Sequence, residues 1–256
     1  MTSKPDKNPE TRSYLQRDLK LLWGLAAARC SKCRVDVVAE ATGEDGEAVL
    51  GQIAHILAHG DKGPRADRSM SADDRRKYPN LILLCGHCHT LVDKQPNTYK
   101  PDDLRGWKRD HEGWVRERLL EEMPDVGFAE LEVVSAALVN NPTPITVALE
   151  LTNPAEKMDR NGLTQDVLFE IQQGMFKSKE VSQFLVAMSR LDRDFPERLR
   201  SGFLTRYREL HADGVTGDAL FVGLRSFAGA NGSFRRQAAG LAVLVYLFET
   251  CEVFER

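Results

Sequence analysis

Residues 80–94, NLILLCGHCHTLVDK, place two cysteines, two histidines and an aspartate directly after a short apolar run. The four apolar residues predict a buried strand that ends at Cys85. A helix is expected next, and it carries His89 and Asp93 four residues apart, on one face. Thiols, imidazoles and carboxylates are the side chains that bind metals. The stretch therefore predicts a strand followed by a helix, with metal ligands where the two meet.

Two CxxC pairs, Cys30/Cys33 and Cys85/Cys88, account for four of the five cysteines. A CxxC turn directs both sulfurs toward one point, and two such turns supply the four thiolates of a tetrahedral Zn²⁺ site. The pairs lie far apart in the chain, so their spacing alone does not fix the fold. We expect one structural zinc ion here; the alternative is a coincidental grouping of buried cysteines.

The 256 residues carry a net charge of −3 and are 42% hydrophobic, which is enough for one large core or two modest ones. The chain as a whole is not basic, so its net charge does not indicate a nucleic-acid-binding protein. The polar start, MTSKPDKNPETRS, and the lack of an apolar run of about 18 residues predict no membrane contact. We therefore expect a cytoplasmic protein, and in that reducing compartment the five cysteines are not expected to form disulfides.

The sequence predicts an α+β fold class with two parts. Residues 1–13 are expected to be a disordered tail, and residues 14–123 to form a domain of short strands and helices. Residues 124–156 have mixed, proline-containing composition and are expected to be an irregular linker. Residues 157–256 hold five helical segments separated by glycine or proline, which predicts an all-α domain.

His55 lies in an apolar, strand-like segment, QIAHILAH, where an imidazole needs a reason. Taken singly, it would be a hydrogen-bonded core histidine, and Asp93 a solvated helix charge. In order along the chain, however, His55, Asn80, His89 and Asp93, framed by the CxxC pairs, resemble the HNH (His-Me finger, ββα-metal) nucleases. The extended pattern IAHI…GPR…NLILLCGHCHTLVD resembles the HNH domains of cyclic-nucleotide-activated anti-phage nucleases.

This resemblance implies a ββα-metal nuclease domain in which His55 is the general base and Asn80 braces the loop that holds it. It also implies that His89 binds a catalytic Mg²⁺ or another divalent cation. We assign Asp93 as the second ligand; the alternative is a carboxylate that orients His55 or His89 without touching the metal. Ala54 stands where many such proteins have a metal-binding aspartate.

In the implied mechanism, His55 takes a proton from the water that attacks phosphorus, while the cation stabilises the growing charge. The basic loop between Gly60 and Tyr78 is expected to contact the phosphates of double-stranded DNA. The predicted contacts are Arg65 first, then Lys62, Arg68 and Arg76. The alternative is an ordinary solvated loop, because aspartates interrupt the positive charge. Nothing predicts base reading, so we expect low sequence specificity. His111, further along, is expected at the surface.

The second part of the chain resembles the C-terminal domain of proteins from bacterial ABC-three-component systems. The segments that carry this resemblance are EKMDRNGLTQDVLFEIQQG, SKEVSQFL and AAGLAVLVYLFETCEVFE. It implies docking onto an ABC- or SMC-like ATPase or the middle component of such a system; self-association is left open. The apolar final helix is expected to lie in a core or in an interface.

Two functions are consistent with these patterns. The first is a metal-dependent DNA endonuclease that acts as the effector of a bacterial anti-phage defence system. The second is a catalytically degenerate, zinc-stabilised nucleic-acid-binding adaptor of the same assembly, suggested by Ala54. The presence of His55, Asn80 and His89 favours the nuclease.

Overall fold

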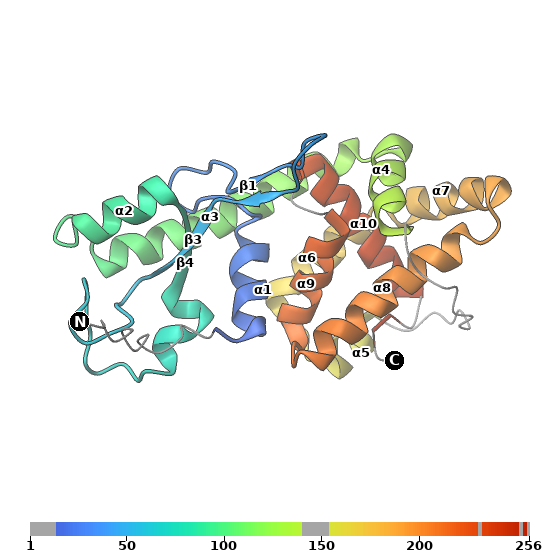
Figure 1. Ribbon diagram of the computed structural model, residues 1–256. Coiled ribbons are helices and arrows are strands. Elements are labelled where there is room, and N and C mark those ends of the chain that lie inside the picture. Colours follow the sequence, from blue (N-terminus) through green and yellow to red (C-terminus); the bar gives the residue numbers. More distant parts are fainter. Residues whose placement is uncertain (1–13, 140–153, 230–231, 251–252, 255–256) are drawn as a thin grey trace, which may run out of the picture.

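The computed structural model of the chain describes residues 14–139, 154–229, 232–250 and 253–254 (Figure 1). The predicted disordered tail, residues 1–13, lies outside the described residues. In Figure 1 the strands lie toward the left and the centre of the molecule and the C-terminal helices toward the right, so the α+β fold class holds in outline. None of the described helices combines the length and the apolar character that a membrane crossing requires.

A hairpin and one helix form the end that carries most predicted site residues. Strand β3 (Gly51–His55) pairs antiparallel with β4 (Leu81–Cys85), and α2 (Gly86–Lys94) packs against both strands. His55 is paired with Leu81 and therefore lies at the end of β3 where the long loop to β4 begins. Residues 81–84 are completely buried, which explains why this apolar run forms the inner strand.

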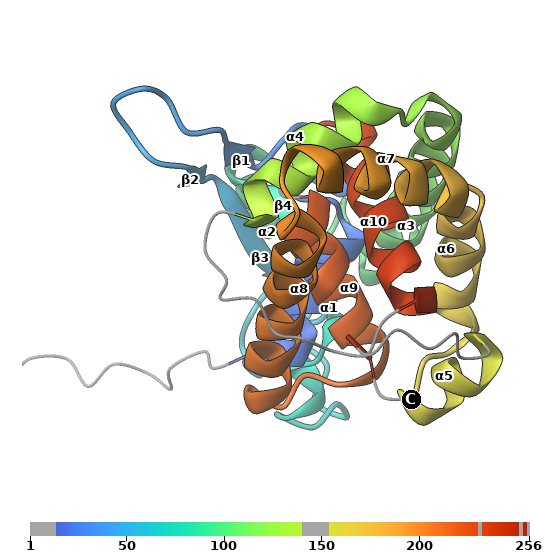
Figure 2. The same ribbon diagram turned by 90° about the vertical axis from the view of Figure 1, so that its right-hand side faces the viewer.

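A second, shorter hairpin pairs β1 (Val38–Ala39) with β2 (Ala48–Val49). Its connecting loop projects from the molecule at the upper left of Figure 2. The long loop between β3 and β4 contains two 3₁₀ turns, η1 (Asp74–Arg76) and η2 (Tyr78–Asn80).

Two helices join the β3–β4 hairpin and α2 to the rest of the molecule. They are α1 (Gln16–Leu25) and α3 (Pro101–Glu122). The 3₁₀ turn η3 (Met123–Asp125) follows α3. The other helices are α4 (Phe128–Val139), α5 (Pro154–Arg160), α6 (Gln165–Met175), α7 (Ser178–Leu191), α8 (Phe195–Ala212), α9 (Gly217–Gly229) and α10 (Phe234–Thr250). Helices α6 to α10 coincide with the five predicted segments.

Helix α10 forms the centre of the helical core. It packs against α3, α4, α6, α7 and α9, and nearly all of its apolar side chains are buried. The apolar final helix therefore lies in the core of this chain, one of the two places predicted for it. Its burial follows from its composition, because a helix that is apolar on most faces must be covered on most faces.

Part of the predicted linker, residues 124–156, is instead regular structure. Helix α4 buries Leu131, Val134 and Leu138, which recur at helical spacing and join the helical core. The prediction was wrong for residues 128–139 because the composition of the whole region concealed this short periodic segment. The proline-containing stretch, residues 140–153, lies outside the described residues.

The two predicted domains share helices and side chains. Leu119 and Met123, at the end of the predicted nuclease domain, belong to the core formed by the C-terminal helices. Helices α1 and α9 approach closely at Gly24, where an added Cβ would lie only 2.1 Å from Val222 Cγ1. Arg225 on α9 donates to the Gly24 carbonyl at 2.7 Å. Residue 123 is therefore not a physical boundary between separate bodies.

His111 is buried, contrary to the surface position predicted for it. Only 2% of the residue is exposed, and its Nε2 lies 3.1 Å from the Ala26 carbonyl oxygen. Burial lowers the pKa of His111. A surface position was predicted because the helix is rich in charged residues, but the His111 side chain faces the C-terminal end of α1.

Candidate metal centre and catalytic cleft

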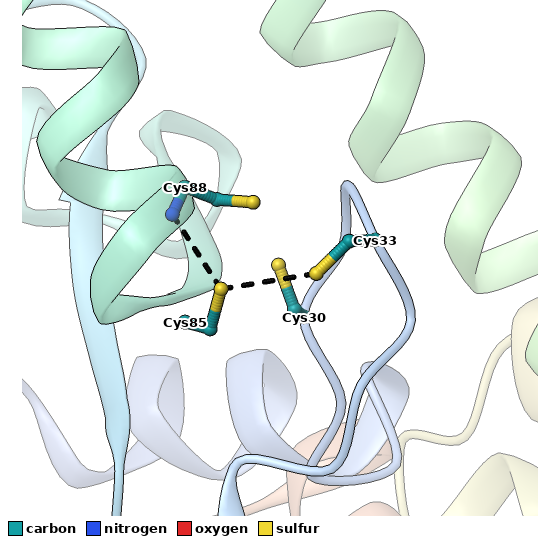
Figure 3. Close-up of side chains that lie close together, drawn as sticks. All are labelled: Cys30, Cys33, Cys85 and Cys88. Carbon is teal, nitrogen blue, oxygen red and sulfur yellow. Dashed lines mark hydrogen bonds between the residues drawn. The ribbon is translucent and has the colours of Figure 1, made fainter.

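The four CxxC cysteines form a cluster that is close enough to hold a metal ion (Figure 3). Their sulfur atoms all lie within 4.8 Å of one another, and Cys33 Sγ is 3.7 Å from Cys85 Sγ. A tetrahedral zinc with four sulfur ligands has sulfur–sulfur distances of about 3.8 Å, given Zn–S bonds of about 2.3 Å. The cluster is therefore compatible with zinc.

Backbone hydrogen bonds position the first CxxC turn. The chain leaves α1 through Ala27 and Ala28, whose φ angles of 51° and 52° are unusual for residues with a side chain. Ser31 N donates to the Leu83 carbonyl at 2.9 Å, which attaches the turn to the middle of β4. The turn closes with a bond from Arg34 N to the Cys30 carbonyl. The two cysteine pairs are thus brought together although they lie far apart in sequence.

The second turn sits at the beginning of α2. Cys85 caps the helix, and its sulfur accepts a bond from Cys88 N at 3.5 Å. Burial raises the pKa of Cys88 and of Cys33. Burial also acts to raise the pKa of Cys85, but hydrogen bonds from Cys88 and the other thiols lower it overall. Four neighbouring thiols resist joint ionisation, and a bound cation supplies the charge that stabilises the thiolates.

A separate cleft of about 510 Å³ lies beside the hairpin. Its walls are the end of β3, the start of the loop that follows it and one face of α2. The residues that line it are Ile53, His55, Ala58, His59, Gly60, Asp61, Lys62, Gly63, Pro64, Arg65, His89 and Asp93. Five residues that the sequence predicted as site residues therefore meet in one cleft.

His55 is partly buried at the end of β3 and is held by aromatic neighbours. Tyr14 Oη lies 3.5 Å from its Nε2, and the ring of His59 meets the His55 ring edge-on at a centroid distance of 5.2 Å. His59 was not singled out as a site residue. Its spacing of four residues from His55, within an apolar segment, is the signal that would have identified it.

Asn80 holds the loop that begins at His55. Its Oδ1 accepts from Leu57 N at 2.9 Å, and its Nδ2 donates to the carbonyls of Leu57 and Arg75, both at 2.9 Å. The Asn80 carbonyl accepts from Ile56 N at the same distance. Only 4% of Asn80 is exposed. The bonds to Ile56 and Leu57 fix the backbone directly after His55, and the bond to Arg75 attaches the later part of the same loop.

His89 and Asp93 converge on the face of α2 that borders the cleft. His89 Nδ1 lies 3.6 Å from Asp93 Oδ2, so one cation can contact both atoms. The other carboxylate oxygen, Oδ1, lies 3.1 Å from Arg65 Nη2. Asp93 is thus placed both for the predicted metal role and for the alternative, in which it orients a neighbour.

The predicted phosphate contacts differ in their exposure. Arg65 does not have the exposure that the predicted phosphate contact needs. Only 3% of its side chain is exposed, and its guanidinium is hydrogen-bonded to the carbonyls of Val92 and Ile56 and to Asp93. Lys62 is exposed and lines the cleft. Arg68 is exposed outside the cleft lining, and Arg76 pairs with Asp73 at 3.5 Å. Of these four predicted residues, Lys62 fits the phosphate role best.

Comparison with known protein families and with curated proteins found no match for this chain. Residue chemistry and geometry therefore carry the functional inference.

Proposed function

We propose that the protein is a metal-dependent endonuclease that hydrolyses phosphodiester bonds of double-stranded DNA with little sequence preference. One observation carries the proposal: His55, His89 and Asp93 meet in a single cleft formed by a β-hairpin and the helix after it. Such hydrolysis needs a general base and a bound divalent cation, and here an imidazole lies beside two possible cation ligands. The order of these residues along the chain, with Asn80 between them, also resembles the HNH nucleases.

In the proposed reaction, His55 in its neutral form takes a proton from the water that attacks phosphorus. Asn80 keeps the His55 loop in place, because it bonds both backbone polar groups of Leu57. Lys62 is at the cleft, where an ammonium group can contact a phosphate oxygen. None of these residues reads base edges, which agrees with low sequence preference.

His89 and Asp93 would hold the catalytic cation, and the distance between their ligand atoms suits this role. A divalent cation there supplies charge stabilisation for the phosphate oxygen and the leaving oxygen. Two protein ligands leave the remaining positions to water and substrate, as Mg²⁺ commonly requires. Ala54 provides no ligand atom, so the affinity of the site for the cation depends on these two residues.

We propose zinc as the metal of the four-cysteine cluster, with a structural role. All four ligands are protein thiolates, and such a closed site has no position for substrate. The cluster joins the first CxxC turn to the β4–α2 junction and thereby fixes the origin of the helix that carries His89. Zinc binding would therefore support the catalytic cleft without taking part in the reaction.

A plasmid-nicking assay tests the nuclease proposal. The full-length protein is incubated with supercoiled plasmid and Mg²⁺ or Mn²⁺, and with EDTA in parallel. We expect nicking that needs the cation and that His55→Ala reduces by about 100-fold or more, the typical contribution of a general base. The matched control is His87→Ala, since His87 is exposed on the same helix outside the cleft lining and should behave like wild type.

Cation binding can be measured separately from cleavage. Mn²⁺ binding, followed by its electron paramagnetic resonance signal, should be lost in His89→Ala and weakened in Asp93→Asn, with zinc content unchanged. Wild-type Mn²⁺ affinity in His89→Ala, or wild-type nicking in His55→Ala, would contradict the assigned roles. If the folded, zinc-loaded protein binds DNA but never nicks it with either cation, the alternative function, a degenerate nucleic-acid-binding adaptor, replaces the nuclease.

We further propose that the protein is the effector of a bacterial anti-phage defence system and docks to an ABC- or SMC-like ATPase or its middle component. The resemblance of the helical half to ABC-three-component proteins supports this. So do large apolar side chains that are exposed around α7, where a protein partner would cover them. The most exposed are Leu191, at 84%, and Phe176, at 74%.

Co-purification tests the docking proposal. The double variant Phe176→Ser/Leu191→Ser should abolish co-purification with the ATPase or middle component and protection in cells, while plasmid nicking persists. Truncation is a poor test, because α1 and α3 pack against the C-terminal helices and would lose part of their core. Unchanged co-purification of the double variant would place the docking surface elsewhere or exclude this partner.

A further inference from the structure

A cavity with a volume of about 910 Å³ lies between the two halves of the molecule. It is walled by α1 and α3 on one side and by the ends of α5, α6 and α9 on the other. This volume lies in the range of small-molecule sites, which often form at the seam between two parts of a protein. The catalytic cleft has a different lining, so the two sites are distinct.

Positive charge is concentrated in this cavity although the chain as a whole is acidic. Six cationic residues line it, Arg17, Arg105, Lys108, Arg109, Arg116 and Arg160. Three carboxylates line it as well, Glu112, Asp166 and Asp218. The lining therefore has a net charge of +3, against −3 for the whole protein. Such an excess attracts an anionic ligand.

Two of the carboxylates already have partners. Glu112 Oε1 accepts from the Tyr78 hydroxyl at 2.6 Å and lies 3.0 Å from Lys108 Nζ. Asp218 accepts from the backbone and the hydroxyl of Thr164 at 2.8 and 2.6 Å. Glu112 is thus paired with Lys108, and Thr164 holds Asp218 at the start of α9, so neither carboxylate forms an ion pair with an arginine of the lining.

The arginines are available for a ligand. Arg17 and Arg116 form no ion pair within the part of the chain that the structure describes, and both are exposed to the cavity or to solvent. Among the residues that the structure describes, Arg105 and Arg160 pair only with exposed carboxylates on their own helices, Asp102 and Glu156. Exposed pairs of this kind contribute little free energy, so a ligand can displace them.

The chemistry of the lining indicates a phosphorylated ligand. Guanidinium groups bind phosphate oxygens through paired hydrogen bonds, and several of them match a group with several negative charges. Leu21, Leu25 and Val222 give the cavity an apolar side as well, which a DNA backbone would not use. We propose that this cavity binds a small phosphorylated molecule, such as a nucleotide, whose phosphates contact Arg17 and Arg116.

The cavity is connected to the catalytic cleft through one short turn. Tyr78 lines the cavity, and Asn80, two residues later in η2, holds the loop after His55. The buried carboxylate of Asp18 on α1 accepts from Tyr78 N at 2.8 Å and fixes the start of this turn. A ligand that moves Tyr78 would therefore act on the His55 loop, so the site is placed to regulate the proposed nuclease.

Isothermal titration calorimetry on the full-length protein in magnesium-free buffer tests the binding site. The probes are ATP and, as the uncharged comparison, adenosine. We expect ATP to bind with a Kd of millimolar or below and adenosine not to bind. Arg17→Ala/Arg116→Ala should weaken ATP binding by about tenfold or more, since each arginine supplies charged hydrogen bonds. Arg160→Ala should weaken it from the opposite wall, and Arg190→Ala, an exposed arginine on α7, should not.

ATP binding is measured without cleavage, so this test can fail while the nuclease proposal holds, and the reverse. No ATP binding to the wild-type protein at millimolar concentration overturns the inference, as does equal binding to the double variant. A 20-base-pair DNA duplex is titrated in parallel. If the double variant loses affinity for the duplex and ATP does not bind, the cavity belongs to the DNA path and the small-molecule proposal is wrong.

Discussion

Arg65 Nη2 lies 3.1 Å from Asp93 Oδ1 and joins the loop after β3 to the last turn of α2. The same guanidinium donates to the carbonyls of Val92 at 2.5 Å and Ile56 at 3.1 Å. Arg65 itself has a φ angle of 61°, so the backbone turns sharply to bring the side chain inward. This arginine holds the two sides of the cleft together.

Arg65→Ala should lower the free energy of unfolding by about 2–4 kcal/mol, because it leaves several carbonyl groups without donors. Arg65→Lys should recover only part of this loss, since one ammonium group cannot reproduce the planar fork. Urea denaturation measures both values. Arg68→Ala, at an exposed position of the same loop, should change stability by less than about 0.5 kcal/mol. A stable Arg65→Ala variant with weakened DNA binding would restore the phosphate-contact role.

Asn80→Ala should destabilise the protein by about 2–3 kcal/mol, because the buried N–H and C=O of Leu57 lose their partner. Nicking should fall together with stability, since the backbone next to His55 is released. Asn80→Asp is the sharper variant: it still accepts from Leu57 N but cannot donate to the two carbonyls. Urea denaturation and the nicking assay are compared with Asn97→Ala, an exposed asparagine. Equal stability of all three variants would contradict the bracing role.

Elemental analysis of protein purified without chelators should find about one zinc ion per chain, on the count of four thiolate ligands. Cys88→Ser should lose that zinc and unfold the β3–β4–α2 end, because the free energy of zinc binding is part of the free energy of folding. Cys251→Ser is the control, since Cys251 lies outside the CxxC pairs. Full stability of a zinc-free wild-type protein would refute a structural metal at this cluster.

Arg225 and Glu170 form an ion pair whose side chains are each only 4% exposed. Arg225→Met should lower the free energy of unfolding by about 3–5 kcal/mol, because Glu170 is left as a buried charge and the Gly24 carbonyl loses a donor. Arg225→Met/Glu170→Leu should be more stable than the single variant. A double-mutant cycle measured by urea denaturation gives the coupling. If the double variant is as unstable as the sum of the single variants, the pair does not act as a unit.

His111 should make stability depend on pH. Burial holds its pKa below the ordinary value of about 6.5, so the unfolded chain binds a proton more readily than the folded one. Stability from this residue is therefore present above about pH 6.5 and decreases as the pH falls below it. His111→Leu should show a smaller loss between pH 7.5 and pH 5.5 in urea denaturation. An unchanged pH dependence in this variant would mean that other groups cause it.

Features that depend on residues close together in the chain could be predicted from the sequence. The CxxC pairs predicted a metal cluster, because a chelating turn needs only four residues. The apolar run at residues 81–84 predicted β4. Apolar residues at helical spacing predicted α6 to α10, because this spacing too is a local pattern. The convergence of His89 and Asp93 also followed from local geometry, because residues four apart share a helical face.

Which charged and polar residues face water could not be predicted and became visible in the folded chain. Arg65 was predicted to contact DNA and His111 to lie at the surface, yet contacts with Val92 and with Ala26, distant in sequence, bury both. The basic cavity likewise combines Arg17, Arg116 and Arg160 from three separate helices. No local pattern records these neighbours, because the burial of a polar side chain depends on hydrogen-bond partners that folding brings from elsewhere in the chain.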